Sequence, residues 1–414
     1  MLPQRLRFQA LAFIGSFLAF WFSQDSTPAQ ILRRMLDLGK FAYMLFALFA
    51  LSMIFHKSLA SARPASERAM AEYYSWIAAG GLFGSVLVGL AVPLLGRHIG
   101  AVALDWVAVG ALAFAAILAR DWEQISPYRK TAAGLAALAL CVAWAVASAG
   151  SRSGTVYNLR NFYGIYSVRD QDGVRSLFHG NTEHGVQFLE PARQNEPLSY
   201  YGFSSPLGEA ADALGSGWRS VGVVGLGAGS LAAYGRRGMA MDFYELDPDV
   251  AAIARRWFTH LRLSPATIRV MTGDGRLSLE RAGGASYDAL ILDAFSSGAV
   301  PIHLLTKDAF AVYLSRLAPD GVILLHVSNR YLDLRPVLAA TARDLGLSAA
   351  AKRQLSAGPV EEGQVPSVWV AIGRDAATIG KLVEKKGWRV LGAGASRATA
   401  WTDRHASLLP ALSF

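Results

Sequence analysis

A glycine-rich turn between two apolar runs is the stretch of this sequence best suited to chemistry. It reads VGVVGLGAGSLAAYGRRGMAMDFYELDPD over residues 221–249, with Gly225, Gly227 and Gly229 in the turn. Glycines let the backbone approach a ligand without Cβ atoms in the way, and a helix predicted after the turn points its N-terminus at that ligand. Glu245 ends the next predicted strand, where its carboxylate is placed to accept hydrogen bonds from ribose hydroxyls. The stretch therefore predicts a site for an adenosine-containing cofactor.

The spacing of the three glycines separates two classes of cofactor. Dinucleotide sites use G-x-G-x-x-G. Here the third glycine comes one residue earlier, and Ser230 takes the later position. The G-x-G-x-G spacing favours S-adenosylmethionine, or its decarboxylated form, as the co-substrate.

Two further acids follow predicted strands and extend the same site. Asp274 and Gly275 stand in TGDGR after the third strand, where the carboxylate can accept a hydrogen bond from an adenine amino group. Asp293 stands in LILDAFSSGAVP after the fourth strand. Open α/β sheets bind ligands at the carboxyl ends of their strands. Each acid alone is compatible with a strand-end cap, but acids at three consecutive strand ends favour a binding site.

Apolar runs that alternate with amphipathic stretches predict the elements that position these residues. The predicted fold class is an α/β doubly wound, methyltransferase-like (Rossmann-like) domain with a parallel sheet, preceded by a small N-terminal β lid. Asp247 and Pro248 open one predicted helix, and Thr306 caps another that ends at APDG. The predicted strands cover residues 220–224, 241–245, 268–271, 287–293, 321–327 and 368–372.

Residues 1–150 are far more apolar than the rest and predict an α-helical membrane region. Charged residues make up only 17% of the chain, against about a quarter in a typical soluble protein. Residues 73–96, 99–119 and 131–151 are each long enough to cross a hydrocarbon core, which takes about 20 residues. Shorter runs at residues 8–24 and 41–56 are weaker candidates, so the region is predicted to contain four or five spans.

The number of spans decides on which side of the membrane the second half lies. The distribution of Lys and Arg between the loops slightly favours five spans, which would place the second half outside the cell. A nucleoside co-substrate is found in the cytoplasm and favours an even number. We follow the co-substrate and predict a multi-pass protein of the cell inner membrane, in contact with the lipid bilayer, with its catalytic domain in the cytoplasm.

Charge pattern and metal-ligand spacing argue against two other classes of partner. The formal charge is +9, but no Lys/Arg-rich run interleaved with aromatics occurs, so we expect no nucleic-acid partner. Cys141 is the only cysteine, and His179 and His184 stand five apart without an H-E-x-x-H pattern, so we expect no metal. His184 is instead either a substrate-binding residue in contact with the nucleoside or a residue that packs within the lid. The sequence leaves a homo-oligomer open.

Several motifs together resemble the spermidine synthase (polyamine aminopropyltransferase) family, and more closely its membrane-fused bacterial branch. The motifs run from about residue 56 to the C-terminal end and include RNFYGIYSV, HGNTEHGVQFLEP, YYGFSSPLG, DAFSSGAVPIHLLTKDAFAVYLSRLAPDGVILLHVSN and WTDRHASLLPAL. The resemblance implies three regions. These are a transmembrane helical region in residues 1–150, a β lid in residues 151–205 and a spermidine synthase-like catalytic domain in residues 206–414.

The resemblance also implies a role for each candidate site residue. The glycine turn and Glu245 hold the thioether nucleoside, and residues 274–275 read the adenine. Asp293 takes part in deprotonating the attacking amine, because an ammonium has no lone pair with which to attack. Tyr200 and Tyr201 match the tyrosine region that faces the amine acceptor.

Two positions depart from the pattern of that family. Its turn usually carries an aspartate where this chain has Ala228, and its loop after the fourth strand usually carries a second aspartate where this chain has Ser296. Removing one partner of a buried charge pair costs about 3–5 kcal/mol. Glu209 and Asp212 are candidates to replace the missing carboxylates.

Three functions therefore stay open at the level of sequence. The first is an aminopropyl-type transfer to an amine that releases methylthioadenosine, which Asp293 and the family resemblance favour. The second is a methyltransferase or lyase reaction of S-adenosylmethionine itself, which Ala228 favours because an uncharged turn tolerates the carboxylate of that compound. The third is a non-catalytic membrane sensor that binds the nucleoside.

Overall fold

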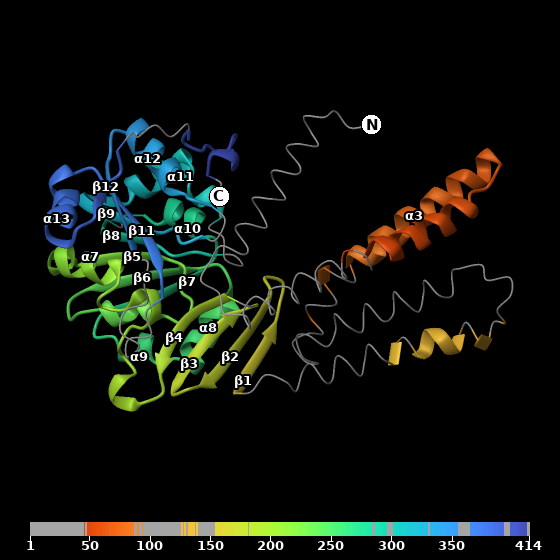
Figure 1. Ribbon diagram of the computed structural model, residues 1–414, viewed down its shortest axis with the longest axis horizontal. Helices are drawn as coiled ribbons and strands as arrows, with labels where there is room; N and C mark the ends of the chain where they lie inside the picture. Colours follow the sequence, from red (N-terminus) through yellow and green to blue (C-terminus); the bar gives the residue numbers. More distant parts are fainter. Residues whose placement is uncertain are drawn as a thin grey trace, which may run out of the picture. The chain divides into compact units, whose positions relative to one another are not determined.

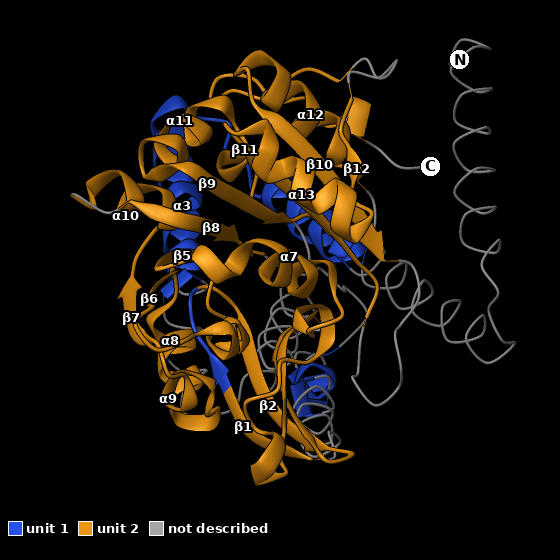
Figure 2. Ribbon diagram, turned by 90° about the vertical axis from the view of Figure 1, so that its left-hand side faces the viewer, with its two compact units in different colours: residues 1–152, 159–162, 414 blue, residues 153–158, 163–413 orange. Residues whose placement is uncertain are grey.

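The computed structural model describes most of residues 154–411 and part of residues 45–139. The described residues are 45, 48–86, 89–90, 94, 126, 128–129, 131–136, 138–139, 154–180, 182–283, 286–295, 301–329, 332–354, 365–392 and 398–411. The chain divides into two compact units (Figure 2). One consists mainly of residues 1–152, and the other comprises residues 153–158 and 163–413.

Apart from residues 159–160, which belong to a strand, the described elements of the first unit are helical. They include α3, Glu67–Val86, and a helical stretch before it at residues 48–61. Within the described residues, no helix has the combination of length and apolar character that a membrane crossing requires. Of the predicted spans, residues 8–24 and 99–119 lie outside the described residues. Residues 41–56, 73–96 and 131–151 are described only in part.

The second unit is built on an eight-stranded sheet in the order β12-β10-β11-β9-β8-β5-β6-β7 (Figure 1). The strands from β7 to β9 in this order pair in parallel, and β11, β10 and β12 continue the sheet with antiparallel pairings. This arrangement confirms the predicted methyltransferase-like Rossmann domain. The strands are β5 (Ser220–Val224), β6 (Ala240–Glu245), β7 (Thr267–Thr272), β8 (Tyr287–Leu292), β9 (Leu317–His326), β10 (Ser348–Gln354), β11 (Ser367–Gly373) and β12 (Arg389–Val390).

Helices cover both faces of this sheet, so residues on both faces of its central strands are buried in apolar cores. In β8, Leu290 and Leu292 join a core cluster with residues of α10 (Gly275–Arg281), α11 (Lys307–Ser315) and α12 (Arg335–Asp344). Ala289 and Ile291, which point the other way, join a second cluster with residues of α7 (Pro206–Leu214), α8 (Pro248–Trp257) and α13 (Ala376–Lys386). Alternate residues of one strand therefore belong to two separate cores.

All six predicted strands are present, but four details of the prediction were wrong. The strand at residues 368–372 was predicted in a parallel sheet, whereas β11 pairs antiparallel with β9. The alanine-rich β10, with the sequence SAAAKRQ, was not predicted because it lacks β-branched and aromatic residues. The APDG sequence does not end α11 but lies within β9, while Thr306 caps α11 as predicted by accepting from the Ala309 N–H. The helix expected after the glycine turn is only a five-residue 3-10 helix, η5 (Ser230–Tyr234), which Gly235 follows.

The segment before the Rossmann domain contains a four-stranded sheet in the order β1-β2-β3-β4. Its strands are β1 (Thr155–Arg160), β2 (Ile165–Gln171), β3 (Val174–His179) and β4 (Thr182–Phe188), and we call this sheet the lid. Asp172 and Gly173, both with left-handed φ, join β2 to β3 as a two-residue hairpin turn. Predicted strand-like pieces GIYSVRD and VRSLFHG correspond to β2 and β3.

Candidate active site

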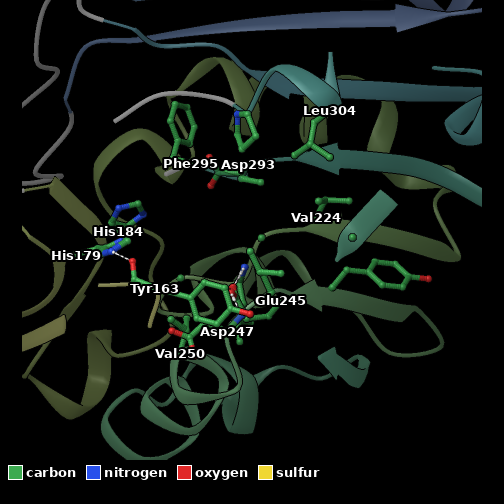
Figure 3. Close-up of a pocket in the computed structure, with 18 of the residues that line it drawn as sticks. Tyr163, His179, His184, Val224, Glu245, Asp247, Val250, Asp293, Phe295 and Leu304 are labelled. Carbon is green, nitrogen blue, oxygen red and sulfur yellow. Dashed lines mark hydrogen bonds between the residues drawn. The ribbon is translucent and has the colours of Figure 1, made fainter. Parts of the chain in front are cut away.

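A cavity of about 170 Å³ lies at the carboxyl ends of β5, β6 and β8, and the lid forms part of its wall (Figure 3). The lid contributes aromatic rings and two histidines, and the Rossmann domain contributes the glycine turn and the acids that end its strands. Most of the predicted site residues meet in this one cavity. They are His184, Tyr201, Gly225, Gly227, Glu245, Asp274, Gly275 and Asp293.

The glycine turn brings three segments of backbone together. Gly225, Gly227 and Gly229 all have left-handed φ values, of 99°, 53° and 83°. A Cβ on Gly225 would overlap the carbonyl of Asp293, and a Cβ on Gly227 would overlap the carbonyl of His184. Gly229 does not line the cavity, since a Cβ there would meet Leu261. The turn therefore needs glycine as much for these backbone contacts as for a ligand.

Glu245 holds the turn in place from the end of β6. One carboxylate oxygen accepts from the Leu226 N–H at 3.0 Å and the other from the Asp247 N–H at 2.9 Å. Its burial raises its pKa, while these two backbone donors favour the charged form. Each oxygen keeps a further lone pair, so Glu245 can support the turn and still accept from ribose hydroxyls.

Asp274 caps α10 at the same edge of the sheet. Its Oδ1 accepts from the Leu277 N–H at 2.9 Å, and its Oδ2 lies 3.6 Å from His303 Nε2. A Cβ on Gly275 would lie 2.6 Å from Val224 Cγ1, so glycine is required for close packing of α10 on β5. Both residues line the cavity, and the adenine role of Asp274 stays a prediction.

Asp293 is a buried carboxylate with a hydrogen-bond donor on each oxygen. Its Oδ1 lies 2.7 Å from His326 Nδ1, and its Oδ2 accepts from the Tyr201 hydroxyl. The side chains of Asp293 and His326 are only 4% and 5% exposed. Burial and the nearby carboxylate raise the pKa of Tyr201 well above its ordinary value, so this hydroxyl stays a donor. The plane of the Asp293 carboxylate is thereby fixed at the cavity wall.

Tyr200 stands behind Tyr201. The two hydroxyl oxygens are 3.1 Å apart, and the Tyr200 ring packs against His326 with centroids 4.4 Å apart. Tyr201 lines the cavity, whereas Tyr200 is not among the lining residues. Of the predicted acceptor-side pair, Tyr201 is the residue placed to meet a substrate.

His326 supports the site through Asp293 and was not assigned to it from the sequence. It stacks on Trp369 with centroids 4.8 Å apart, and the ring of Phe295 packs against its side at 4.8 Å. Its Nε2 lies 2.7 Å from Ser328 Oγ, which accepts from the Val368 N–H. Ser328 can therefore donate to Nε2, which leaves Nδ1–H to donate to Asp293. The available signal was a polar residue at the end of the apolar run GVILL in β9.

His184 lines the cavity from β4. Its Nε2 is buried and has no hydrogen-bond partner among the described residues. Burial, and then the neighbouring His179, lower the pKa of His184 to about 4. The imidazole is therefore neutral near pH 7.

The structure corrects the interpretation of Ala228. This residue is 1% exposed and does not line the cavity, because its Cβ faces Gly185 of β4. An aspartate at this position would run into the backbone of the lid, so Ala228 cannot by itself distinguish between donors. Ser296 lies outside the described residues.

The proposed replacements for the missing carboxylates are engaged elsewhere. Glu209 accepts from Lys352 Nζ at 2.6 Å, and Asp212 accepts from Lys386 Nζ at 2.6 Å. Neither acid lines the cavity. Within the described residues, no group of three or more His, Cys, Asp or Glu side chains is arranged to hold a metal ion.

Parts of the chain are similar to polyamine aminopropyltransferases. It is 41% identical to the polyamine aminopropyltransferase of Vibrio vulnificus over 85 residues, which are 20% of this chain and 28% of that protein. It is 25% identical to a probable polyamine aminopropyl transferase of Bifidobacterium longum over 175 residues, 42% of this chain and 37% of that protein. The chain thus spans well under half the length of these two relatives. No family model matches it.

The solved structures to which the chain is similar include a probable spermidine synthase and a methyltransferase-like protein. A probable spermidine synthase from Corynebacterium glutamicum is 20% identical, covers 62% of this chain and 98% of its own, and has a TM-score of 0.45. Human methyltransferase-like protein 13 in complex with SAH is 21% identical, covers 43% of this chain and 84% of its own, and has a TM-score of 0.34.

Gly185→Ala should lift β4 from the glycine turn, because the new Cβ would overlap that of Ala228 and Gly185 has a φ of +144°. We expect the free energy of unfolding, measured by chemical denaturation, to fall by about 1–3 kcal/mol, the usual cost of overpacking. Gly173→Ala is the matched control, since it has a φ of +78° but open space around it. If Gly185→Ala costs no more than the control, the close approach described above is wrong. Adding Ala228→Gly to Gly185→Ala should recover part of the loss.

Proposed function

We propose that the chain belongs to the spermidine synthase family and transfers an aminopropyl-type group from intact or decarboxylated S-adenosylmethionine to an amine, releasing methylthioadenosine. The observation that carries this proposal is Asp293, a buried carboxylate held by two donors in the same cavity as the glycine turn and Glu245. The local similarity to polyamine aminopropyltransferases supports the same reaction.

The charges around the cavity favour cationic ligands. Glu245, Asp247, Asp274 and Asp293 line it, and no Lys or Arg is among the described lining residues. A sulfonium and an ammonium are both positively charged. A site lined by four carboxylates and by no Lys or Arg among its described residues attracts sulfonium and ammonium ions and repels anions.

Asp293 is placed to handle the proton of the acceptor amine. The sulfonium of the donor supplies an electrophilic carbon. The amine nitrogen forms a bond to this carbon while the C–S bond breaks. The electron pair of the broken C–S bond remains on sulfur. The proton that must leave the ammonium beforehand passes to Asp293, whose carboxylate orients the amine through a remaining lone pair. Tyr201 and His326 keep that carboxylate in one orientation.

The order of the strands suggests how the donor lies. β6 and β7, which lead to Glu245 and Asp274, are on one side of β5, and β8, which leads to Asp293, is on the other. The nucleoside then occupies the edge near β6 and β7, and the chain on the sulfur extends across the glycine turn toward Asp293. This direction brings the reacting carbon to the carboxylate.

Product analysis separates the proposed reaction from its alternatives. Purified protein is incubated with each donor and a panel of diamines, and the products are identified by mass spectrometry. We expect methylthioadenosine together with an alkylated amine. S-adenosylhomocysteine would indicate methyl transfer, and methylthioadenosine without an alkylated amine would indicate a lyase. Binding without any turnover would leave the sensor interpretation.

Asp293→Asn and Glu245→Ala should fail in different ways. Asp293→Asn removes the proton acceptor, so we expect turnover to fall by about 10²–10⁴-fold while methylthioadenosine still binds. Glu245→Ala removes charge-assisted hydrogen bonds worth about 1.5–3 kcal/mol, so we expect binding itself to weaken. Isothermal titration calorimetry and initial rates measure the two effects. Asp375→Asn, at a helix cap that does not line the cavity, serves as control. Loss of nucleoside binding in Asp293→Asn would contradict the assignment.

We further propose that residues 1–150 anchor the enzyme in the inner membrane, with the catalytic domain in the cytoplasm. The support is the three long runs at 73–96, 99–119 and 131–151, of which only the second contains a charged residue, Asp105. We expect the protein to stay in the membrane fraction after an alkaline carbonate wash. The double variant Cys141→Ser/Arg404→Cys carries a single cysteine at an exposed position of the catalytic domain. This cysteine should react with an impermeant maleimide only after the cells are opened. Labelling in intact cells would place the domain outside.

A further inference from the structure

The cavity has no Lys or Arg among its described lining residues to pair with the carboxylate of intact S-adenosylmethionine. Among the described lining residues, only His179, His184 and His303 can become cations. The other charged lining residues are acids. His179 already places Nε2 3.1 Å from the Tyr163 carbonyl, and His303 Nε2 lies 3.6 Å from the Asp274 carboxylate. His184 is the histidine whose Nε2 has no partner in the described part of the chain.

The backbone of His184 lies directly on the glycine turn. Its carbonyl accepts from the Ala228 N–H at 3.2 Å, and the adjacent Gly185 faces the Cβ of Ala228. The side chain of His184 lines the cavity beside this turn, which the chain on the sulfur crosses in the donor orientation proposed above. The turn itself contributes no side-chain charge there.

The electrostatic surroundings of His184 are few and well defined. His179 faces it from β3, with ring centroids 5.6 Å apart. Asp293 at the end of β8 favours its protonation, while burial and the two histidines His179 and His326 oppose it. The turn between Gly225 and Gly229 has no titratable residue. Burial keeps this imidazole neutral near pH 7 in the free protein, and a negative charge brought next to it would favour its protonation.

We propose that His184 recognises the donor by its carboxylate: it takes up a proton when intact S-adenosylmethionine binds, and the imidazolium pairs with that carboxylate. This inference rests on the proposed function, and it names the residue that selects between the two donors. Without the proton, the carboxylate would enter a cavity lined by four acids and a neutral imidazole. The decarboxylated donor lacks this group and leaves His184 neutral.

The inference has a definite consequence for pH. A carboxylate raises the pKa of His184 in the complex above its value of about 4 in the free protein. Between these two values binding takes up a proton, so the affinity for the intact donor falls by up to about tenfold for each unit that the pH rises. Above the pKa of the complex, the uptake ends. The groups common to both donors' sites cancel when the two affinities are compared at each pH.

The test is a proton count by isothermal titration calorimetry. Intact S-adenosylmethionine, its decarboxylated form and methylthioadenosine are titrated into the full-length protein in two buffers of different ionisation enthalpy, between pH 6 and pH 8. We expect an uptake approaching one proton for the intact donor at the acid end, and none for the other two ligands. His184→Gln should abolish the uptake. It should also lower the affinity for the intact donor, relative to methylthioadenosine, by about tenfold or more.

His260→Gln is the matched control. His260, in α9 (His260–Leu263), is also buried with a pKa lowered to about 4, but it does not line the cavity. This variant should keep both the uptake and the ratio of affinities. Wild-type protein that binds the intact donor without taking up a proton overturns the inference, whatever the variants do, as does an unchanged uptake in His184→Gln. Wild-type protein that does not bind methylthioadenosine overturns the proposed function instead.

Discussion

The close approach of two backbones, strand β4 of the lid and the glycine turn after β5, is the constraint on which the site depends. The carbonyl of His184 accepts from the Ala228 N–H, and Gly185 leaves room for the Ala228 Cβ. Glycine at 227 and 185 and a small residue at 228 are therefore required by geometry. Backbone contacts hold the lid to the turn. The side chain of His184 is therefore not needed for this contact and can face the cavity.

The chemistry of the site comes from acids that are buried but individually held. Glu245 accepts from two backbone N–H groups, and Asp293 has one donor on each oxygen. Buried charges are tolerated when hydrogen bonds satisfy them. The rings of Tyr200, Phe295 and Trp369 pack around His326, the imidazole that donates to Asp293. These residues thus help to position the acid.

Residues whose role depends on nearby sequence could be predicted, whereas residues whose partners are distant in the sequence could not. Glu245 and Asp293 were found because each ends a local apolar run, and a strand with its terminal acid is readable within ten residues. His326 was not assigned to the site, because its partner Asp293 is 33 residues away and only the pairing of β8 with β9 brings them together.

Ala228 was misinterpreted for the same reason. Its neighbour is Gly185 in another sheet, and no pattern around either residue indicates that contact. The missing β10 shows the complementary limit. A strand of three alanines followed by Lys, Arg and Gln is held in place by pairing with β11 and β12 and not by its own propensity.

The contacts of the C-terminal segment determine when the site can form during synthesis. Arg276, next to the predicted adenine-binding residues, donates to both carboxylate oxygens of Asp403, at 2.8 Å and 2.7 Å, and Asp403 also accepts from Thr306. Asp403 is translated 127 residues after Arg276. At about 5–20 residues per second, the ribosome needs roughly 6–25 s to cover that distance. The nascent chain can therefore pair its central parallel strands before Asp403 is available to pair with Arg276.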